Sequence, residues 1–152
     1  MLTLFLIRHA DAEIHSTTGK DINRCLSLKG IKQCVELKSR IENYDWSNVD
    51  FYVSASERTK QTFNLIFQDN FCSYHNELYL ASAENLLSFI NKLNSSKSIC
   101  IVSHNEGISS LASLLTGQRI LMNTASFLEL RFDFESTEYI SAETALISDF
   151  IF

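Results

Sequence analysis

Continuous apolar runs and stretches of helical periodicity alternate along the 152 residues of the chain. Residues 2–7 and 99–102 are continuous runs of apolar and β-branched residues, as expected of strands that are covered on both faces. Shorter runs bounded by turn residues predict the other strands. These shorter segments are residues 51–54, 71–74, 126–134 and 144–152.

Apolar residues recur at helical spacing between the runs, first after Ser27, which is a suitable N-cap. Further helices are predicted over residues 57–67, 83–93 and 108–115, and Gly117 is expected to end the last of them. Strands that alternate with helices indicate an α/β fold, here a sandwich with a mostly parallel central sheet in a single domain, residues 1–152. The apolar residues of the first helix are Leu28, Ile31, Val35, Leu37 and Ile41.

Composition limits the classes of protein to which the chain can belong. Apolar residues make up 45% and charged residues 20%, which is enough for one core and argues against disorder. The 11 phenylalanines, Phe71 among them, are expected to be mostly buried. A net charge of −5 argues against a general nucleic-acid-binding protein, although it allows one small positive pocket.

The lack of a recognisable targeting signal and the pattern of cysteines predict a cytoplasmic protein. The apolar run near Met1 ends in Arg8 and lacks the form of a signal peptide, and no stretch approaches the length of a membrane span. Four cysteines form no CxxC pair, and Cys34 and Cys100 lie within apolar patterns. We therefore expect core thiols in a reducing compartment, with neither a membrane nor a nucleic acid as partner.

Candidate chemistry gathers at the ends of two buried strands. One run leads into Arg8 and His9, the other into His104, and a third strand end is followed by Arg58. In α/β sheets, ligands bind at the carboxyl ends of the strands, so these side chains are expected to share one crevice. Cationic groups crowded together repel one another unless an anion lies between them, and arginine donors suit the oxygens of phosphate.

His9 is a suitable nucleophile for a phosphoryl group. Neutral imidazole presents a lone pair near pH 7 without an adjacent base, whereas serine needs one. The other ring nitrogen must donate its proton to an acceptor, and a backbone carbonyl in the loop after His9 is expected to serve. A dication is disfavoured beside Arg8 and Arg58, and no HxH, HExxH or CxxC spacing is present, so neither a metal nor another cofactor is expected.

Three segments in order resemble the histidine phosphatase superfamily. LIRHADAE at residues 6–13 is similar to its RHG/RHA signature, SASERTKQT at 54–62 to its S-x-x-x-R-x-x-Q-T segment, and VSHNEG at 102–107 to its second-histidine segment. LYLAS at residues 78–82 and the LTG at 115–117 resemble, more narrowly, the small SixA-like phosphohistidine phosphatases.

The resemblance implies a three-layer, phosphoglycerate mutase-like α/β/α sandwich and a role for each matched residue. His9 would accept the phosphoryl group, and Arg8, Arg58 and His104 would bind it. Arg24, in the segment that corresponds to R-P-L-T, and Asn105, beside His104, would add phosphate or substrate contacts. Three customary residues are replaced, by Cys25, Ala55 and Glu106, and Glu106 is expected to face solvent so that its charge stays away from the anion.

The general acid has two candidates, Asp11 and Glu77. Asp11 lies two residues after the nucleophile, and Glu77 precedes the LYLAS segment. A leaving oxygen or nitrogen must gain a proton, and either carboxyl group could deliver it. Each is also an ordinary candidate for a surface or capping carboxylate.

Three functional hypotheses follow for the whole chain. About 40 residues separate the Arg58 segment from His104, too few for the helical insertion that covers the pocket in related mutases and phytases. A shallow pocket favours a phosphatase that acts on a phosphorylated protein, a histidine-containing phosphotransfer domain. The alternatives are a phosphatase for small phosphoesters such as sugar phosphates, and a non-catalytic module that binds phosphoproteins.

Overall fold

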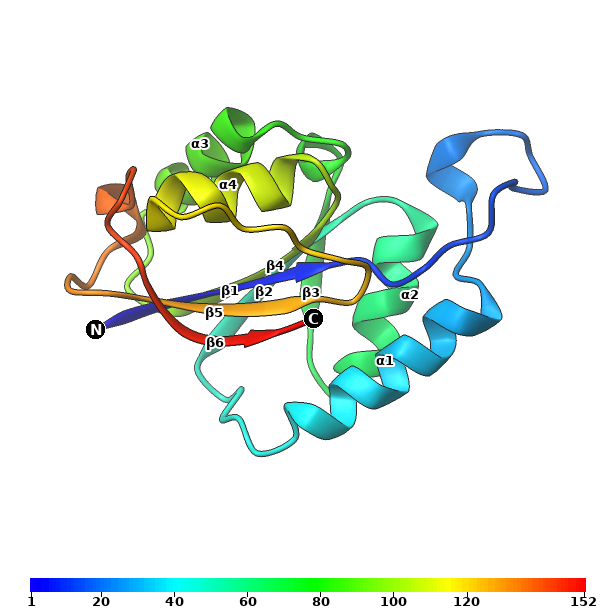
Figure 1. Cartoon of the computed structure of the whole chain (residues 1–152), viewed down its shortest axis with the longest axis horizontal. Coiled ribbons are helices and arrows are strands. Elements are labelled where there is room, and N and C mark those ends of the chain that lie inside the picture. Colours follow the sequence, from blue (N-terminus) through cyan, green and yellow to red (C-terminus); the bar gives the residue numbers. More distant parts are fainter.

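Six strands form one mixed sheet in the computed structural model, which describes residues 1–152 (Figure 1). The strands are β1 (Leu2–Arg8), β2 (Val49–Ser54), β3 (Cys72–His75), β4 (Ser98–Ser103), β5 (Phe127–Phe132) and β6 (Leu146–Ile151). Their order across the sheet is β3-β2-β4-β1-β5-β6. β5 is antiparallel to both of its neighbours and the other pairs are parallel, so β5 alone runs against the other five. The expected mostly parallel sheet is thus confirmed.

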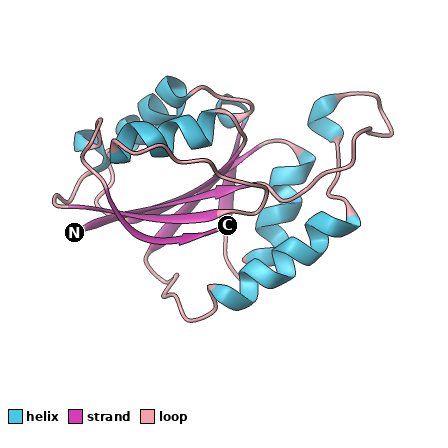
Figure 2. Cartoon of the chain, viewed as in Figure 1, coloured by secondary structure: helices cyan, strands magenta, loops and turns pink.

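Helices cover both faces of the sheet (Figure 2). They are α1 (Leu28–Arg40), α2 (Glu57–Ile66), α3 (Ala83–Leu93) and α4 (Gly107–Thr116), with short 3₁₀ helices η1 (Asp21–Asn23), η2 (Asn76–Leu78) and η3 (Thr137–Tyr139). α1 and α2 lie on one face, and α3 and α4 lie on the other (Figure 1). This is the expected three-layer sandwich. None of the helices has the length and apolar character needed to cross a bilayer.

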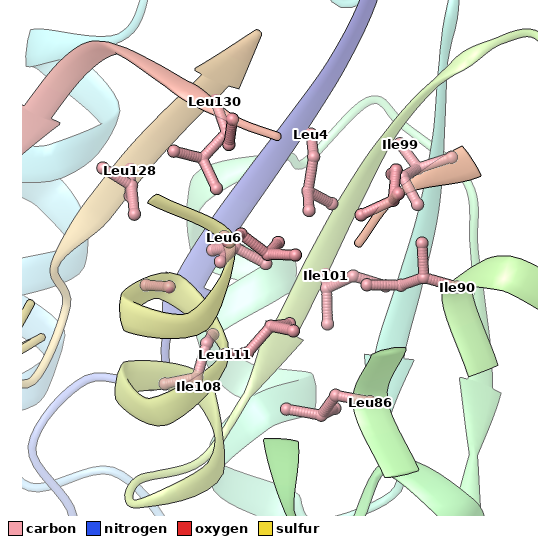
Figure 3. Packing of buried hydrophobic residues seen from close by; sticks show 14 of the residues in the cluster. Leu4, Leu6, Leu86, Ile90, Ile99, Ile101, Ile108, Leu111, Leu128 and Leu130 are labelled. Atoms are coloured by element: carbon pink, nitrogen blue, oxygen red, sulfur yellow. The ribbon is translucent and has the colours of Figure 1, made fainter. Parts of the chain in front are cut away.

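Side chains that alternate along the strands divide the core into two clusters. Leu4 and Leu6 of β1 point to the face below α3 and α4, whereas Phe5 and Ile7 point to the opposite face. The first cluster is almost wholly aliphatic (Figure 3). The second is rich in aromatic rings, and its aromatic members and neighbours are Phe5, Tyr44, Trp46, Phe51, Phe63, Phe67 and Phe127.

Serine side chains cap three of the helices. Ser27, Ser56 and Ser82 precede α1, α2 and α3, and each Oγ accepts a hydrogen bond from the backbone N–H three residues ahead, at 3.0, 3.3 and 3.2 Å. Gly117 ends α4 in the left-handed conformation, with φ of 68°. The predicted cap at Ser27 and the predicted stop at Gly117 are both confirmed.

The apolar residues that predict α1 do not all lie on its buried face. Leu28 is 78% exposed, and Ile31 and Val35 are also exposed. Gly30 sets the rotation of the helix: a Cβ at this position would lie 2.0 Å from the carbonyl oxygen of Asp11, so only glycine allows this approach. The buried positions are Gly30, Cys34 and Leu37, followed by Ile41.

Two predictions for Phe71 are wrong. It is neither the first residue of the third strand nor a core residue. β3 begins one residue later, and Phe71 is 96% exposed. β3 is an edge strand that pairs only with β2, and neither of the buried clusters includes this ring. The high phenylalanine content therefore does not predict the burial of each ring.

Candidate active site

The carboxyl ends of β1 and β4 bring the two predicted histidines together. The strands are parallel neighbours, with Arg8 opposite Ser103, and the backbone N–H of His9 donates to the Ser103 carbonyl at 3.0 Å. The imidazole ring centres of His9 and His104 are 5.2 Å apart. The expectation that two strand ends form one crevice is confirmed.

The hydrogen bonds of His9 orient its imidazole for attack. Nδ1 lies 2.7 Å from the carbonyl oxygen of Ala10, which can only accept, so Nδ1 carries the proton and Nε2 keeps its lone pair. The backbone N–H of Ala10 donates to Thr62 Oγ1 at 3.0 Å and thereby holds this peptide in place. The backbone acceptor expected after His9 is confirmed.

Both imidazoles are neutral near pH 7. Burial lowers the pKa of His9 to about 4, and the positive charges of Arg58 and Arg8 act in the same direction, whereas the Ala10 carbonyl opposes it. Burial also lowers the pKa of His104 to about 3, helped by His9 and Arg58. A neutral His9 is the form that a nucleophile requires.

His104 has the opposite arrangement of ring nitrogens. Its Nε2 lies 2.7 Å from Ser54 Oγ, at the end of β2, while its buried Nδ1 has no hydrogen-bond partner among the protein atoms. The ring of Tyr79 packs edge-on against it, with the ring centres 5.5 Å apart. His104 therefore presents Nδ1 to the crevice that it shares with His9.

Arg8 and Arg58 complete the group of predicted site residues around His9 and His104. Arg8 Nη1 donates to the Met122 carbonyl at 3.0 Å, and burial lowers the pKa of this guanidinium. Arg58 is only 3% exposed, and both of its terminal nitrogens donate to Asp21. Nε of Arg8 and Nε of Arg58 are buried without a partner, and these atoms and His104 Nδ1 are three of the four such side-chain atoms in the molecule.

A pocket of about 330 Å³ joins these groups. Buried polar nitrogens normally have hydrogen-bond partners, so three unpartnered ones beside one pocket suit an anion with several oxygens. The chemistry of this set is that of an oxyanion site, with His9 Nε2 available for attack. The pocket is lined by Arg8, His9, Asp11, Ala12, Asp21, Arg24, Arg58, Leu80, His104, Asn105 and Thr124.

The remaining residues predicted from the sequence fall into two groups. Arg24, Asp11 and Asn105 line the pocket, although each also makes other contacts: Asp11 Oδ2 accepts from Ser27 Oγ at 2.5 Å, and Asn105 Oδ1 accepts from Ser109 Oγ at 2.5 Å. Glu106 is exposed, as expected.

The structure does not bring Glu77 to the pocket. Its side chain is 64% exposed, and its carboxylate lies 3.9 Å from His75 Nδ1. η2, in which it lies, buries Leu78 instead, and Glu77 is not among the residues that line the pocket. Of the two residues expected as proton donors, only Asp11 lines the pocket.

Two further residues of the site were not predicted from the sequence. Asp21 lies between the first predicted strand and the first predicted helix, and Tyr79 lies in the LYLAS segment; the Tyr79 hydroxyl donates to Asp21 Oδ2. Arg24 Nη1 also donates to this carboxylate, at 2.9 Å. The spacing of Asp21 three residues before Arg24 was the one signal available, since such a pair can join across a helical turn.

Comparison with protein families agrees with this geometry. A family model described as the histidine phosphatase superfamily, branch 1, matches residues 4–81, which is just over half of the chain. The chain belongs to this superfamily. Histidine phosphatases of the superfamily are phosphatases and mutases that use a phosphohistidine intermediate. No curated protein sequence matches the chain.

Solved structures share the whole fold with this histidine phosphatase. A protein named phosphohistidine phosphatase SixA from Nakamurella multipartitia is 17% identical, with a TM-score of 0.84 over 99% of this chain and 95% of that one. The protein histidine phosphatase SixA in complex with tungstate is 16% identical, with a TM-score of 0.81 over 99% and 96%. A phosphoserine phosphatase variant from Entamoeba histolytica, in complex with phosphoserine, is 18% identical, with a TM-score of 0.69 over 99% and 96%. At such identities these likenesses establish the fold, which is phosphoglycerate mutase-like.

Proposed function

We propose that the protein is a phosphohistidine phosphatase, which moves the phosphoryl group of a phosphorylated protein onto His9 and then hydrolyses it. The observation that carries this proposal is the set of three unpartnered buried nitrogens on Arg8, Arg58 and His104, three residues that line the same pocket as His9, whose Nδ1 is bound and whose Nε2 is free. Such donors stabilise the charge that spreads over the equatorial oxygens of a transferring phosphoryl group.

The reaction has two displacement steps. In the first, the Nε2 lone pair of His9 forms a bond to phosphorus while the bond from phosphorus to the substrate breaks. The leaving nitrogen or oxygen keeps that electron pair and takes up a proton, for which Asp11 is our candidate donor because its residue lines the pocket. In the second, a water oxygen forms a bond to phosphorus and gives a proton to the Asp11 carboxylate, while the bond from phosphorus to Nε2 breaks; the products are neutral His9 and inorganic phosphate.

The mouth of the pocket favours a protein substrate. Leu80 lines the pocket and is 55% exposed, and Ile14 is 79% exposed beside Asp21 and Arg24. Exposed aliphatic side chains around a polar site suit contact with another protein surface better than contact with a small, fully hydrated ester. We therefore favour a histidine-containing phosphotransfer domain over a sugar phosphate or another small phosphoester.

The cysteines support our expectation that the enzyme works in the cytoplasm. All four are free thiols, and Cys34 and Cys100 are buried in the core. Burial raises the pKa of the Cys34 thiol to about 11, so this thiol stays protonated. Unpaired, unreactive core thiols are typical of a reducing compartment.

The test is to trap the phosphorylated enzyme. Incubation with a phosphohistidine-bearing phosphotransfer domain, followed by rapid quenching at alkaline pH and mass spectrometry, should locate one acid-labile phosphate on His9. The His9→Ala variant should form no adduct and should lose turnover, because His104, the other imidazole of the pocket, is expected to carry its proton on Nδ1 and so to have no lone pair there. His15→Ala is the matched control, since His15 is exposed and does not line the pocket.

Substrate class is tested with the same preparation. We expect kcat/KM, measured under the same conditions on the phosphorylated domain, a sugar phosphate and an aryl phosphate, to be highest for the phosphorylated domain. A preference for small esters would favour the alternative phosphatase. Stoichiometric binding of the phosphorylated domain without any labelling of His9 would instead favour a non-catalytic binding module and would refute the proposed reaction.

A further inference from the structure

The carboxylate of Asp21 accepts hydrogen bonds from three polar side chains, two of which, Arg24 and Arg58, line the pocket. Its Oδ2 accepts from Arg58 Nη2 at 3.0 Å and from the hydroxyl of Tyr79, and its Oδ1 accepts from Arg24 Nη1 at 2.9 Å. The backbone carbonyl of Asp21 accepts from Arg58 Nη1 at 2.8 Å. One residue of η1 therefore takes up both terminal nitrogens of Arg58.

We propose that Asp21 is a positioning residue, which holds both terminal nitrogens of Arg58 and so fixes the direction in which its remaining N–H groups face the transferring phosphoryl group. This inference rests on the proposed function. Nε is the one nitrogen of Arg58 that makes no hydrogen bond to the protein. Arg24 is held beside it by the same carboxylate, with its Nε bound to the Glu13 carbonyl at 2.6 Å.

Arg58 needs such a partner because it lies inside the protein. A guanidinium that is 3% exposed has little access to water, so its five N–H groups depend on protein or ligand acceptors. Without Asp21, the terminal nitrogens would lose both of their acceptors in the protein, and the guanidinium would be free to turn. The phosphate would still be attracted, but the donor would be presented from a different direction. Catalysis depends on such directions more steeply than binding does.

The charge of Asp21 contributes as well as its geometry. The hydrogen bond from Tyr79, with those from Arg24 and Arg58, holds the pKa of the Asp21 carboxyl well below its usual range, although partial burial opposes this. Asp21 is therefore ionised at any pH at which the protein works, and it does not serve as a general acid. Its negative charge offsets the repulsion between Arg24 and Arg58.

Tyr79 links this arrangement to the second histidine. The tyrosine hydroxyl donates to Asp21, and the tyrosine ring packs at 83° against the imidazole of His104. The guanidinium carbon of Arg58 lies 6.0 Å from the centre of the same ring. A change at Asp21 therefore alters the surroundings of two phosphate donors and leaves the hydrogen bond of His9 intact.

The test compares Asp21→Asn with Asp50→Asn. The asparagine keeps the size of the side chain but turns an NH₂ group toward arginine donors. Asp50 is a suitable control because it pairs with Lys97 at 3.1 Å on the surface, away from the pocket. Asp21→Asn should lower kcat by about 10- to 100-fold, in line with a misdirected donor. The inhibition constant of inorganic phosphate should change by less than about threefold, because the lost negative charge favours the anion while the misdirection disfavours it.

Asp21→Glu should recover part of kcat, since the carboxylate returns at a slightly different distance. An Asp21→Asn enzyme that is as active as Asp50→Asn would overturn the inference. So would a loss of phosphate affinity that parallels the loss of kcat, because that result indicates a pocket that has merely lost its structure.

A measurement without turnover separates this inference from the proposed function. In ¹H–¹⁵N NMR spectra, inorganic phosphate should shift the Nε–H resonance of Arg58 in the wild-type protein, and Arg58→Lys identifies that signal by its loss. The shift should be absent or altered in Asp21→Asn. An unchanged phosphate-dependent shift in Asp21→Asn contradicts the positioning role, even if the wild-type protein forms no phosphohistidine.

Discussion

The two strand ends of the site carry the same residue type in opposite hydrogen-bonding states. At the end of β1, His9 uses Nδ1 to donate to a carbonyl and leaves Nε2 free. At the end of β4, His104 uses Nε2 to contact a hydroxyl and leaves Nδ1 free. The difference shows that the hydrogen-bond partner of one ring nitrogen determines whether the other ring nitrogen can act as a nucleophile or as a donor.

The chemistry of the two partners explains the assignment. The Ala10 carbonyl can only accept, so His9 is restricted to the tautomer with a nucleophilic Nε2. The Ser54 hydroxyl can donate or accept, so His104 can carry its proton on Nδ1 and donate to an anion. Under the proposed function, His9 is therefore the residue expected to attack the phosphoryl group, and His104 the residue expected to stabilise it.

Replacement of either histidine should have the largest effects among the tests of this comparison. His104→Asn should slow the phosphorylation of His9 by about 10²- to 10³-fold, the usual effect of one lost oxyanion donor. The adduct should still form on His9, as measured by quenched-flow and mass spectrometry. His9→Asn should form none. Equal and complete loss of labelling in both variants would contradict the division of roles.

Acid should destabilise the fold through the same two imidazoles. Unfolded histidine binds a proton below pH 6.5, whereas the folded pKa values are about 4 for His9 and about 3 for His104. The unfolded state therefore binds more protons as the pH falls below 6.5, and this favours unfolding. Each imidazole should remove about 2 kcal/mol from the free energy of unfolding between pH 7 and pH 5.

Urea denaturation followed by circular dichroism at the two pH values measures this loss, and saturating phosphate should reduce it. His104→Asn should show a smaller dependence on pH than the wild-type protein, because one of the two groups is missing. An identical dependence in the two proteins would show that carboxylates, rather than the imidazoles, determine the acid sensitivity.

The smallest effect should come from the hydroxyl that orients His104. Ser54→Ala removes the 2.7 Å contact with Nε2 and should lower kcat/KM by about 3- to 10-fold, as expected for the loss of about 1 kcal/mol of hydrogen bonding. Ser73→Ala is a matched control, because Ser73 Oγ makes the same contact with His75 Nε2 at 2.8 Å outside the pocket. Indistinguishable rates for the two variants would contradict an orienting role for Ser54.

The order of elements could be predicted from the sequence because local patterns determine it. The apolar runs of β1 and β4, which are buried on both faces, and the serine and glycine caps are properties of a few consecutive residues. The rotation of α1 could not be predicted in this way. It depends on the contact between Gly30 and the Asp11 backbone, which come from distant parts of the chain.

The residues of the site can be divided in the same way, into those that the sequence pattern predicts and those that depend on tertiary contacts. Arg8, His9, Arg58 and His104 follow strand ends, so the topology of a parallel sheet is sufficient to bring them together. The roles of Asp21 and Tyr79 depend on how the loop between β1 and α1 folds back over the pocket. No periodic pattern in the sequence predicts the course of that loop. The distance of Glu77 from the pocket likewise depends on the turn that η2 makes after β3.

The aromatic composition of one sheet face has a practical consequence. Trp46, the single tryptophan, lies among Phe5, Phe51 and Phe67 below α1 and α2, whereas the face below α3 and α4 is mostly aliphatic. Trp46 fluorescence, excited at the red edge of the protein absorption band, will therefore detect changes in the layer that α1 and α2 cover. It will not detect changes in the layer that α3 and α4 cover. A sensor for the second layer has to be introduced by design, for example as an indole placed on α4.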